Sequence, residues 1–215
     1  MSQKPRFISF EGSEACGKTT QLALLKERLE QRGDRVILTR EPGGTPIGEM
    51  IRHLLKHALE GRGMASETEL LLFAASRAEL VRKVIVPALD AGAWVLSDRF
   101  SDSTTVYQGV ARGVAPAAVE SVNSFATAGL APGLTLLLDL PAEEAARRLQ
   151  ARPQAPEQRF DRIEKEDSAF FDRVRAGFHQ LAAAQPERIK TIPSAASIED
   201  VAARVWEKVT DAFQL

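Results

Sequence analysis

The sequence predicts an α/β domain in which a five-stranded parallel sheet is covered by helices on both faces. Short apolar runs typical of buried strands alternate with longer segments of helical periodicity, and a glycine-rich loop joins the first strand to the first helix. Parallel strands need crossover connections, which the intervening helices supply. A chain of 215 residues is expected to form one domain, residues 1–215, with a sizeable core.

The expected strands are apolar runs bounded by turn residues, and the expected helices fill the segments between them. The strands are residues 7–10, 35–39, 93–97, 134–140 and 188–192, and the helices are the segment between Gly17 and Gly33, then 46–59, 66–91, 116–128, 142–151, 166–185 and 197–213. Ser66 and Glu69 are interpreted as a capping box at the start of the longest helix, which Pro87 is expected to kink or divide. Residues 100–130 are less periodic than the rest of the chain, apart from the helix expected at about 116–128.

The chain is organised around the glycine-rich loop. Residues 12–19 fit G-x-x-x-x-G-K-[ST] at every fixed position. Backbone N–H groups of such a loop bind phosphate oxygens, while Lys18 would reach the β- and γ-phosphates and Thr19 would hold Mg²⁺. A chance match in a strand-to-helix turn is the alternative, but the flanking elements favour a phosphate loop. The fold class is therefore a P-loop NTPase-like three-layer sandwich, in which the loop would bind nucleotide phosphates and Mg²⁺.

Every residue of this loop is a candidate contact to the phosphates of the bound nucleotide. The predicted set is Gly12, Ser13, Glu14, Ala15, Cys16, Gly17, Lys18, Thr19 and Thr20. Cys16 is the single cysteine, which excludes an intramolecular disulfide. It is either a small residue that fits the loop or an oxidation-sensitive thiol, since a helix N-terminus lowers the pKa of a thiol.

Arginines crowd the expected carboxyl edge of the sheet. They are Arg40, Arg77, Arg99, Arg152, Arg159 and Arg162. One nucleoside triphosphate needs fewer cations, whereas two phosphorylated ligands meeting end to end would use them in phosphoryl transfer. Ordinary surface charge is the alternative for each. The polar, proline-containing segment 152–162 is expected to be a mobile lid that excludes water from the site.

Composition and charge argue against several other classes. The formal net charge of −1 does not favour nucleic acid or a membrane surface as partner, and no apolar run of about 18 residues predicts a membrane span. The first residues lack the apolar region of a signal peptide, so a cytoplasmic protein is expected. His53 and His57 lie one helical turn apart, but without a third ligand the pair is expected to be surface or packing residues rather than a zinc site.

Six motifs occur in one order along the chain. They are the phosphate loop with Glu14 inside it, Thr-Arg-Glu-Pro-Gly-Gly-Thr at 39–45, Leu-Phe-Ala-Ala-Ser-Arg at 72–77, Ser-Asp-Arg at 97–99, Ser-x-x-x-Tyr-Gln-Gly at 103–109 and Asp-Arg-Ile-Glu at 161–164. Over essentially its whole length the sequence closely resembles the thymidylate kinase family, of the bacterial type with lid arginines. The resemblance implies a nucleoside monophosphate kinase domain with a lid at about 152–165, which phosphorylates dTMP to dTDP with ATP and Mg²⁺ for dTTP synthesis.

The resemblance also implies a dTMP site. In it Phe73 stacks on thymine, Arg77 and Gln108 read the polar edge of the base, and Tyr107 lies under the sugar and disfavours a 2′-hydroxyl. The other implied acceptor contacts are Glu41, Pro42, Arg52, Arg99 and Ser103. From the residues alone, Phe73 could be core packing and Arg52 a surface salt bridge.

The implied catalytic residues are Lys18, Arg99, Arg159, Arg162 and Glu14, and Asp98 joins Thr19 at the metal. Some relatives carry a catalytic arginine where this chain has Ala15, so the resemblance implies that the lid supplies the cation. The lid looks longer than in some relatives; which of its arginines acts stays open, with Arg159 and Arg162 favoured over Arg152.

Two other functions are compatible with a phosphate loop. A kinase for another nucleoside monophosphate would need a different pocket, and a nucleotide-gated binding protein would bind no acceptor. By analogy with the family a homodimer is expected, for which helices 66–91 and 116–128 offer apolar faces. Core packing would explain the same residues.

Overall fold

The fold is built on one parallel sheet, seen in a computed structural model that describes residues 4–58, 61, 63–151 and 161–215. The strands are β1 (Phe7–Glu11), β2 (Val36–Arg40), β3 (Trp94–Asp98), β4 (Leu134–Asp139) and β5 (Ile189–Pro193). They are all parallel and stand in the order β2-β3-β1-β4-β5. The predicted five-stranded parallel sheet is confirmed, because apolar runs buried on both faces are strong signals for such strands.

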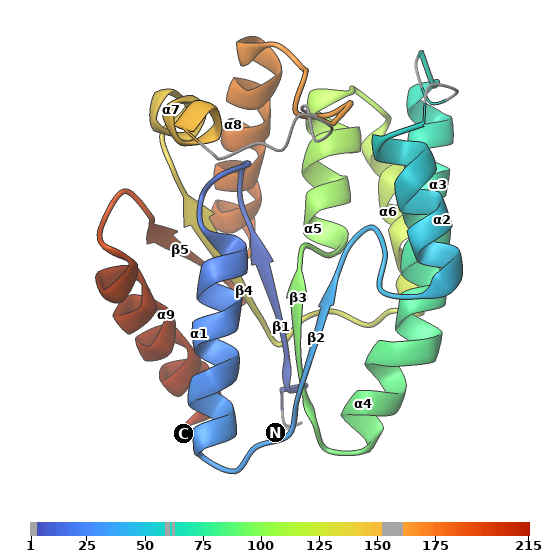
Figure 1. The fold of residues 1–215 in the computed structure, drawn as a ribbon. Coiled ribbons are helices and arrows are strands. Elements are labelled where there is room, and N and C mark those ends of the chain that lie inside the picture. Colours follow the sequence, from blue (N-terminus) through green and yellow to red (C-terminus); the bar gives the residue numbers. More distant parts are fainter. Residues whose placement is uncertain (1–3, 59–60, 62, 152–160) are drawn as a thin grey trace.

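Helices cover both faces of the sheet (Figure 1). Their bounds are α1 (Lys18–Gln31), α2 (Pro46–Lys56), α3 (Ser66–Leu80), α4 (Val86–Asp90), α5 (Ser101–Thr104), α6 (Pro116–Thr127), α7 (Ala142–Ala151), α8 (Ser168–Ala184) and α9 (Ile198–Phe213). On one face α1 and α9 bury a cluster that includes Leu29, Leu96 and Val205. On the other face Leu137 packs against Phe178 of α8. The predicted three-layer sandwich is therefore confirmed.

The long helix predicted at 66–91 is divided. A π-helical segment, η2 (Val81–Ile85), joins α3 to α4 directly before Pro87. Proline cannot donate a backbone hydrogen bond, and its ring clashes with a carbonyl one turn back, so the wider turn accommodates it. The capping-box prediction is wrong: Ala65 occupies the N-cap position and no side chain caps α3.

Residues 101–111, whose sequence shows little periodicity, are nevertheless helical. They form α5 and a second π-helical segment, η3 (Thr105–Ala111). The helical period is hidden because polar side chains occupy buried positions, among them Asp102, Ser103 and Gln108. Ser103 and Gln108 line the site described below, whereas Asp102 bonds to Thr135 and Arg188.

The carboxyl ends of the strands gather at one end of the molecule, opposite the two chain termini (Figure 1). In sheets of this kind ligands bind beyond the carboxyl ends of the strands. Within the ranges that the structure describes, no helix combines the length and apolarity needed to cross a membrane.

Candidate functional site

The glycine-rich loop has the backbone of an anion-binding turn between β1 and α1. Gly12 and Gly17 have φ angles of 135° and 94°, in the region that favours glycine. A Cβ at Gly12 would collide with the carbonyl oxygen of Leu138. Ala15 also adopts a positive φ, 57°. Since α1 begins at Lys18, the loop places the N-terminus of this helix at the site.

Lys18 is nearly buried inside the loop. Its Nζ donates to the carbonyl oxygens of Ser13, at 2.7 Å, and Gly12, at 3.3 Å. The Sγ of Cys16 lies 3.5 Å from the same Nζ. A phosphate oxygen would offer this ammonium group a charged acceptor in place of neutral carbonyls, which makes a stronger hydrogen bond.

Thr19 and Asp98 come together although they are far apart in the sequence. The Thr19 hydroxyl donates to Asp98 Oδ2 over 3.3 Å, at the carboxyl end of β3. Hydroxyl and carboxylate oxygens suit Mg²⁺, which takes few protein ligands and completes its shell with water and substrate phosphates. No cluster of three or more His, Cys, Asp or Glu side chains fit for a metal occurs in the described ranges. The oxygen pair at Thr19 and Asp98 therefore fits the ion that a phosphate loop needs.

A cleft opens beside the loop. It is lined by Glu14, Glu41, Pro42, Lys56, Phe73, Arg77, Arg99, Ser103, Thr104, Tyr107, Gln108 and Ile163. Every residue predicted to contact dTMP lines it except Arg52, whose Nη1 donates to the carbonyl oxygen of Pro42 at 2.9 Å. Because Glu14 belongs to the loop, the cleft and the loop form one continuous site.

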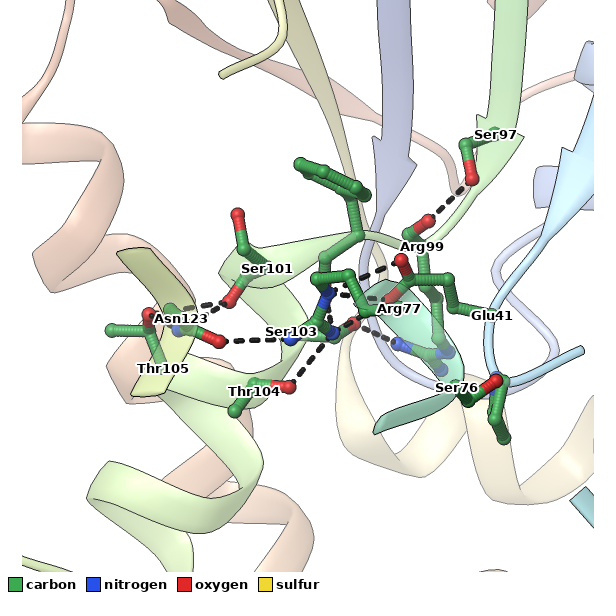
Figure 2. Close-up of polar contacts among 12 residues, drawn as sticks. Glu41, Ser76, Arg77, Ser97, Arg99, Ser101, Ser103, Thr104, Thr105 and Asn123 are labelled. Carbon is green, nitrogen blue, oxygen red and sulfur yellow. Dashed lines mark hydrogen bonds and ion pairs between the residues drawn. The ribbon is translucent and has the colours of Figure 1, made fainter. Parts of the chain in front are cut away.

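Arg77 forms the buried wall of the cleft. Its polar contacts are drawn in Figure 2. Its side chain is 1% exposed, and its Nε and Nη2 donate to Glu41 Oε2 at 2.8 and 2.6 Å. Nη1 donates to Asn123 Oδ1 at 2.8 Å, and Nη2 reaches the Thr104 hydroxyl at 2.9 Å. Burial raises the pKa of Glu41, against the lowering effect of Arg77. The guanidinium is thus held in one orientation before any ligand binds.

Arg99 lies where the loop and the cleft meet. Its φ of 71° is unusual for a residue with a side chain, and Ser97 Oγ donates to its carbonyl oxygen at 2.6 Å. Its Nη2 donates to Glu14 Oε1 at 2.6 Å and to the Tyr107 hydroxyl at 3.1 Å, while Nη1 donates to Ser103 Oγ at 3.0 Å. The network therefore links Glu14 of the phosphate loop to two acceptor-side groups, Ser103 and Tyr107.

The electrostatics of this junction favour an ionised Glu14. Burial by itself raises the pKa of Glu14, but the charges of Arg99, Lys18 and Lys56 outweigh it and lower the pKa to about 2. Glu14 is therefore a carboxylate at neutral pH, able to accept hydrogen bonds from a ligand hydroxyl.

Glu11, the last residue of β1, was not predicted as a site residue from the sequence. It is fully buried and accepts from the backbone N–H of Phe100 at 2.8 Å and from the Ser103 hydroxyl. Burial, followed by the charge of Asp102, raises its pKa to about 8, although Arg99 lowers it. The sequence feature that could have predicted its role is a charged residue directly after the strand run at residues 7–10, since an ionisable side chain is seldom buried without a partner. Glu11 supports the segment that carries Arg99 and Ser103.

Glu69 is a second missed residue. Its Oε1 accepts from Gln108 Nε2 at 2.7 Å and from Arg112 Nε at 3.3 Å. Arg162, predicted as a catalytic lid residue, ion-pairs with Glu69 Oε2 at 2.5 Å and donates from Nε to the Leu55 carbonyl at 2.9 Å. Its side chain thus contacts α2, through Leu55, and α3, through Glu69. Arg152 and Arg159 lie outside the described residues.

A phosphate loop at the end of a parallel sheet, joined through Arg99 to a second polar cleft, defines a P-loop nucleotide-binding protein with room for a second ligand. A family model described as thymidylate kinase matches residues 10–205. The chain belongs to the thymidylate kinase family.

Individual relatives agree with this assignment. The chain is 46% identical to a thymidylate kinase of Bradyrhizobium sp. (strain ORS 278), covering 96% of this chain and 90% of that protein. It is 50% identical to one of Synechococcus sp. (strain JA-2-3B'a(2-13)), covering 94% and 93%. The crystal structure of thymidylate kinase from Ehrlichia chaffeensis is similar with a TM-score of 0.74 and 33% identity, over 94% of this chain and 97% of that one.

Proposed function

We propose that the loop and the cleft together transfer the γ-phosphoryl group of ATP to dTMP. The protein is an ATP-dependent kinase of the thymidylate kinase family and forms dTDP, a step in dTTP synthesis. The observation that carries the assignment of the site is the Glu14–Arg99 contact, which joins the donor and acceptor halves. Two phosphorylated ligands that meet at such a junction can be held in line for transfer.

On the donor side, the loop N–H groups and Lys18 hold the phosphates of ATP. When bound, Mg²⁺ would be held by Thr19 and Asp98 and would neutralise charge on the β- and γ-phosphates. Arg99 lies between the two ligands and stabilises the charge that spreads over the transferred group. The nucleophile is already an anionic phosphate oxygen, so positioning and charge neutralisation do most of the work.

On the acceptor side, Phe73 stacks on thymine, and Arg77 and Gln108 contact its polar edge. These side chains line one cleft, with Phe73 and Arg77 on α3 and Gln108 on η3. Tyr107 and Glu14 approach the sugar from the side of Arg99, to which both are hydrogen-bonded. A flat apolar face and a donor–acceptor edge are the features by which such a pocket recognises a pyrimidine.

The lid supplies the remaining cations in this proposal. The chain acts as one kinase domain, residues 1–215, with a lid at about 152–165. Arg162 is held by Glu69 and the Leu55 carbonyl, so it would have to leave these partners to reach the phosphates. Binding of both nucleotides would provide the charge that draws it away, and Arg159 is the other candidate cation.

The decisive experiment is a coupled ADP-release assay with ATP and Mg²⁺, offering dTMP, dUMP, dCMP, dAMP, dGMP and UMP in turn. ADP release that strongly favours dTMP supports the assigned cleft. Equal release with every acceptor would contradict it.

We also propose a homodimer through the outer face of α3 and α6. Phe125 and Leu71 are 85% and 58% exposed on these helices, which pack side by side. Exposed apolar side chains grouped in this way are typical of an interface. In sedimentation velocity, Phe125→Asp should turn a wild-type dimer into a monomer. Ile198→Asp on α9, 54% exposed in the native chain, is the matched control and should remain dimeric.

A wild-type protein that sediments as a monomer at assay concentrations would contradict the dimer. So would a Phe125→Asp variant that sediments like the wild type.

A further inference from the structure

A buried carboxylate controls the orientation of one amide in the cleft. Glu69 is 2% exposed, and its Oε1 lies 2.7 Å from Gln108 Nε2. Within the described part of the chain, no hydrogen bond reaches Gln108 Oε1, although Gln108 is itself buried and lines the cleft. The amide therefore uses its nitrogen on the protein and keeps its oxygen for another donor.

Glu69 can accept hydrogen bonds but cannot donate one. Burial raises its pKa, but the hydrogen bond from Gln108 and the charges of Arg112 and Arg162 outweigh this, so the pKa lies below its usual value. An ionised carboxylate is an acceptor only. Rotating the Gln108 amide by half a turn would set its oxygen against a carboxylate oxygen and would lose a charge-assisted hydrogen bond.

Two cations keep the carboxylate in place. Arg112 Nε contacts Oε1 at 3.3 Å, and Arg162 pairs with Oε2. Arg112 is itself held by Glu166, whose Oε1 lies 2.6 Å from its Nη2. The orientation of the amide is thus set by side chains outside the cleft, before a substrate enters.

The fixed amide distinguishes two pyrimidines of nearly equal shape. The N3 position of thymine carries a hydrogen and donates, whereas N3 of cytosine is an acceptor. We propose that Glu69 is a positioning residue for base specificity, which holds the Gln108 oxygen toward the cleft so that it accepts the thymine N3–H and repels cytosine N3. This inference rests on the proposed dTMP site.

The test compares Glu69→Gln with the wild type on two acceptors that differ only at this edge, dTMP and 5-methyl-dCMP. A glutamine at this position can donate as well as accept, so the Gln108 amide can turn round. The ratio of kcat/KM for dTMP to that for 5-methyl-dCMP should fall by about 10-fold or more, the usual worth of one buried hydrogen bond to substrate. Rates on dTMP alone should fall less.

A second matched pair covers the case that Glu69→Gln does not fold. Glu69→Asp and Glu69→Asn have side chains of equal length, but only the aspartate is restricted to accepting hydrogen bonds. The ratio of kcat/KM for dTMP to that for 5-methyl-dCMP should therefore be lower in Glu69→Asn than in Glu69→Asp. Arg188→Met, which breaks an ion pair with Asp102 outside the cleft, is a control for general destabilisation and should keep the wild-type ratio.

Three results would overturn the inference. An unchanged ratio in Glu69→Gln, with dTMP still phosphorylated, would refute the role of Glu69 and leave the proposed function standing. An equal loss of the ratio in Arg188→Met would show a general structural effect. A wild-type protein that does not prefer dTMP over 5-methyl-dCMP would refute the assigned cleft itself.

Discussion

The donor and acceptor halves of the site are held by different kinds of contact. In the phosphate loop, Lys18 donates to main-chain carbonyls, and the Thr19–Asp98 pair is long and exposed. In the cleft, Arg77 and Glu41 are buried side chains with short, bidentate contacts. Ligand phosphates can replace the loop contacts, whereas the cleft contacts exist before the substrate binds.

This difference separates catalysis from stability. Removing Lys18 takes away a partner of the ligand phosphates, but the carbonyl groups of Gly12 and Ser13 that it leaves behind are neutral. Removing one member of a buried ion pair leaves an uncompensated charge in the protein interior. Mutations in the donor half should therefore lower turnover, and mutations in the acceptor wall should also lower the free energy of unfolding.

The largest effect is expected at Lys18. Lys18→Ala should lower kcat by about 1000-fold, because it removes charge at the position of the transferred phosphoryl group. The urea midpoint should change little, since the partners of Lys18 are backbone carbonyls. The coupled assay and a denaturation curve measure both. Near-normal turnover would contradict the donor half of this comparison.

Arg77→Met should lower the free energy of unfolding by about 3–5 kcal/mol, because Glu41 is left buried without its partner. The double variant Glu41→Gln with Arg77→Met removes both charges and should recover part of this loss. Urea denaturation of the three proteins tests the pair. If the single variant is as stable as the wild type, the acceptor wall is not held as described.

Asp98→Asn should raise the Mg²⁺ concentration needed for half-maximal activity by roughly 10-fold, because a neutral amide is a weaker ligand for a hard cation than a carboxylate. A Mg²⁺ titration of the ADP-release rate measures it. Asp139→Asn, at the end of strand β4 on the other side of β1, is the control and should titrate like the wild type. Equal titrations for all three proteins would exclude Asp98 from the metal site.

A more gradual effect, spread over two pH units, is a pH dependence of the free energy of unfolding that comes from Glu11. Its pKa of about 8 means that the folded protein holds a proton at pH 6–8 which the unfolded chain has released, so the free energy of unfolding falls as the pH rises. Over that range the loss should be about 2 kcal/mol. Glu11→Gln, a neutral isostere, should remove this part of the slope in urea denaturation from pH 6 to 8. A parallel slope in both proteins would refute the raised pKa.

The sequence by itself determined the sheet, the loop and the family. Strands buried on both faces are continuous apolar runs, and a phosphate loop needs its glycines and lysine at set spacings, so both signals are local. Residues 12–19 and the motifs around Phe73, Arg99 and Gln108 therefore stood out, and the cleft brings most of the predicted acceptor residues together.

Only the tertiary structure decided how the polar residues are paired. Glu69 looked like a helix cap, but its partner Gln108 is 39 residues away, and Arg77 meets Glu41 across 36 residues. The helix at 101–111 was hidden because its buried face is polar, with partners on β1 and β4. A local pattern predicts that a residue is buried or helical, but the partner that makes a buried charge tolerable is set by the packing of distant segments.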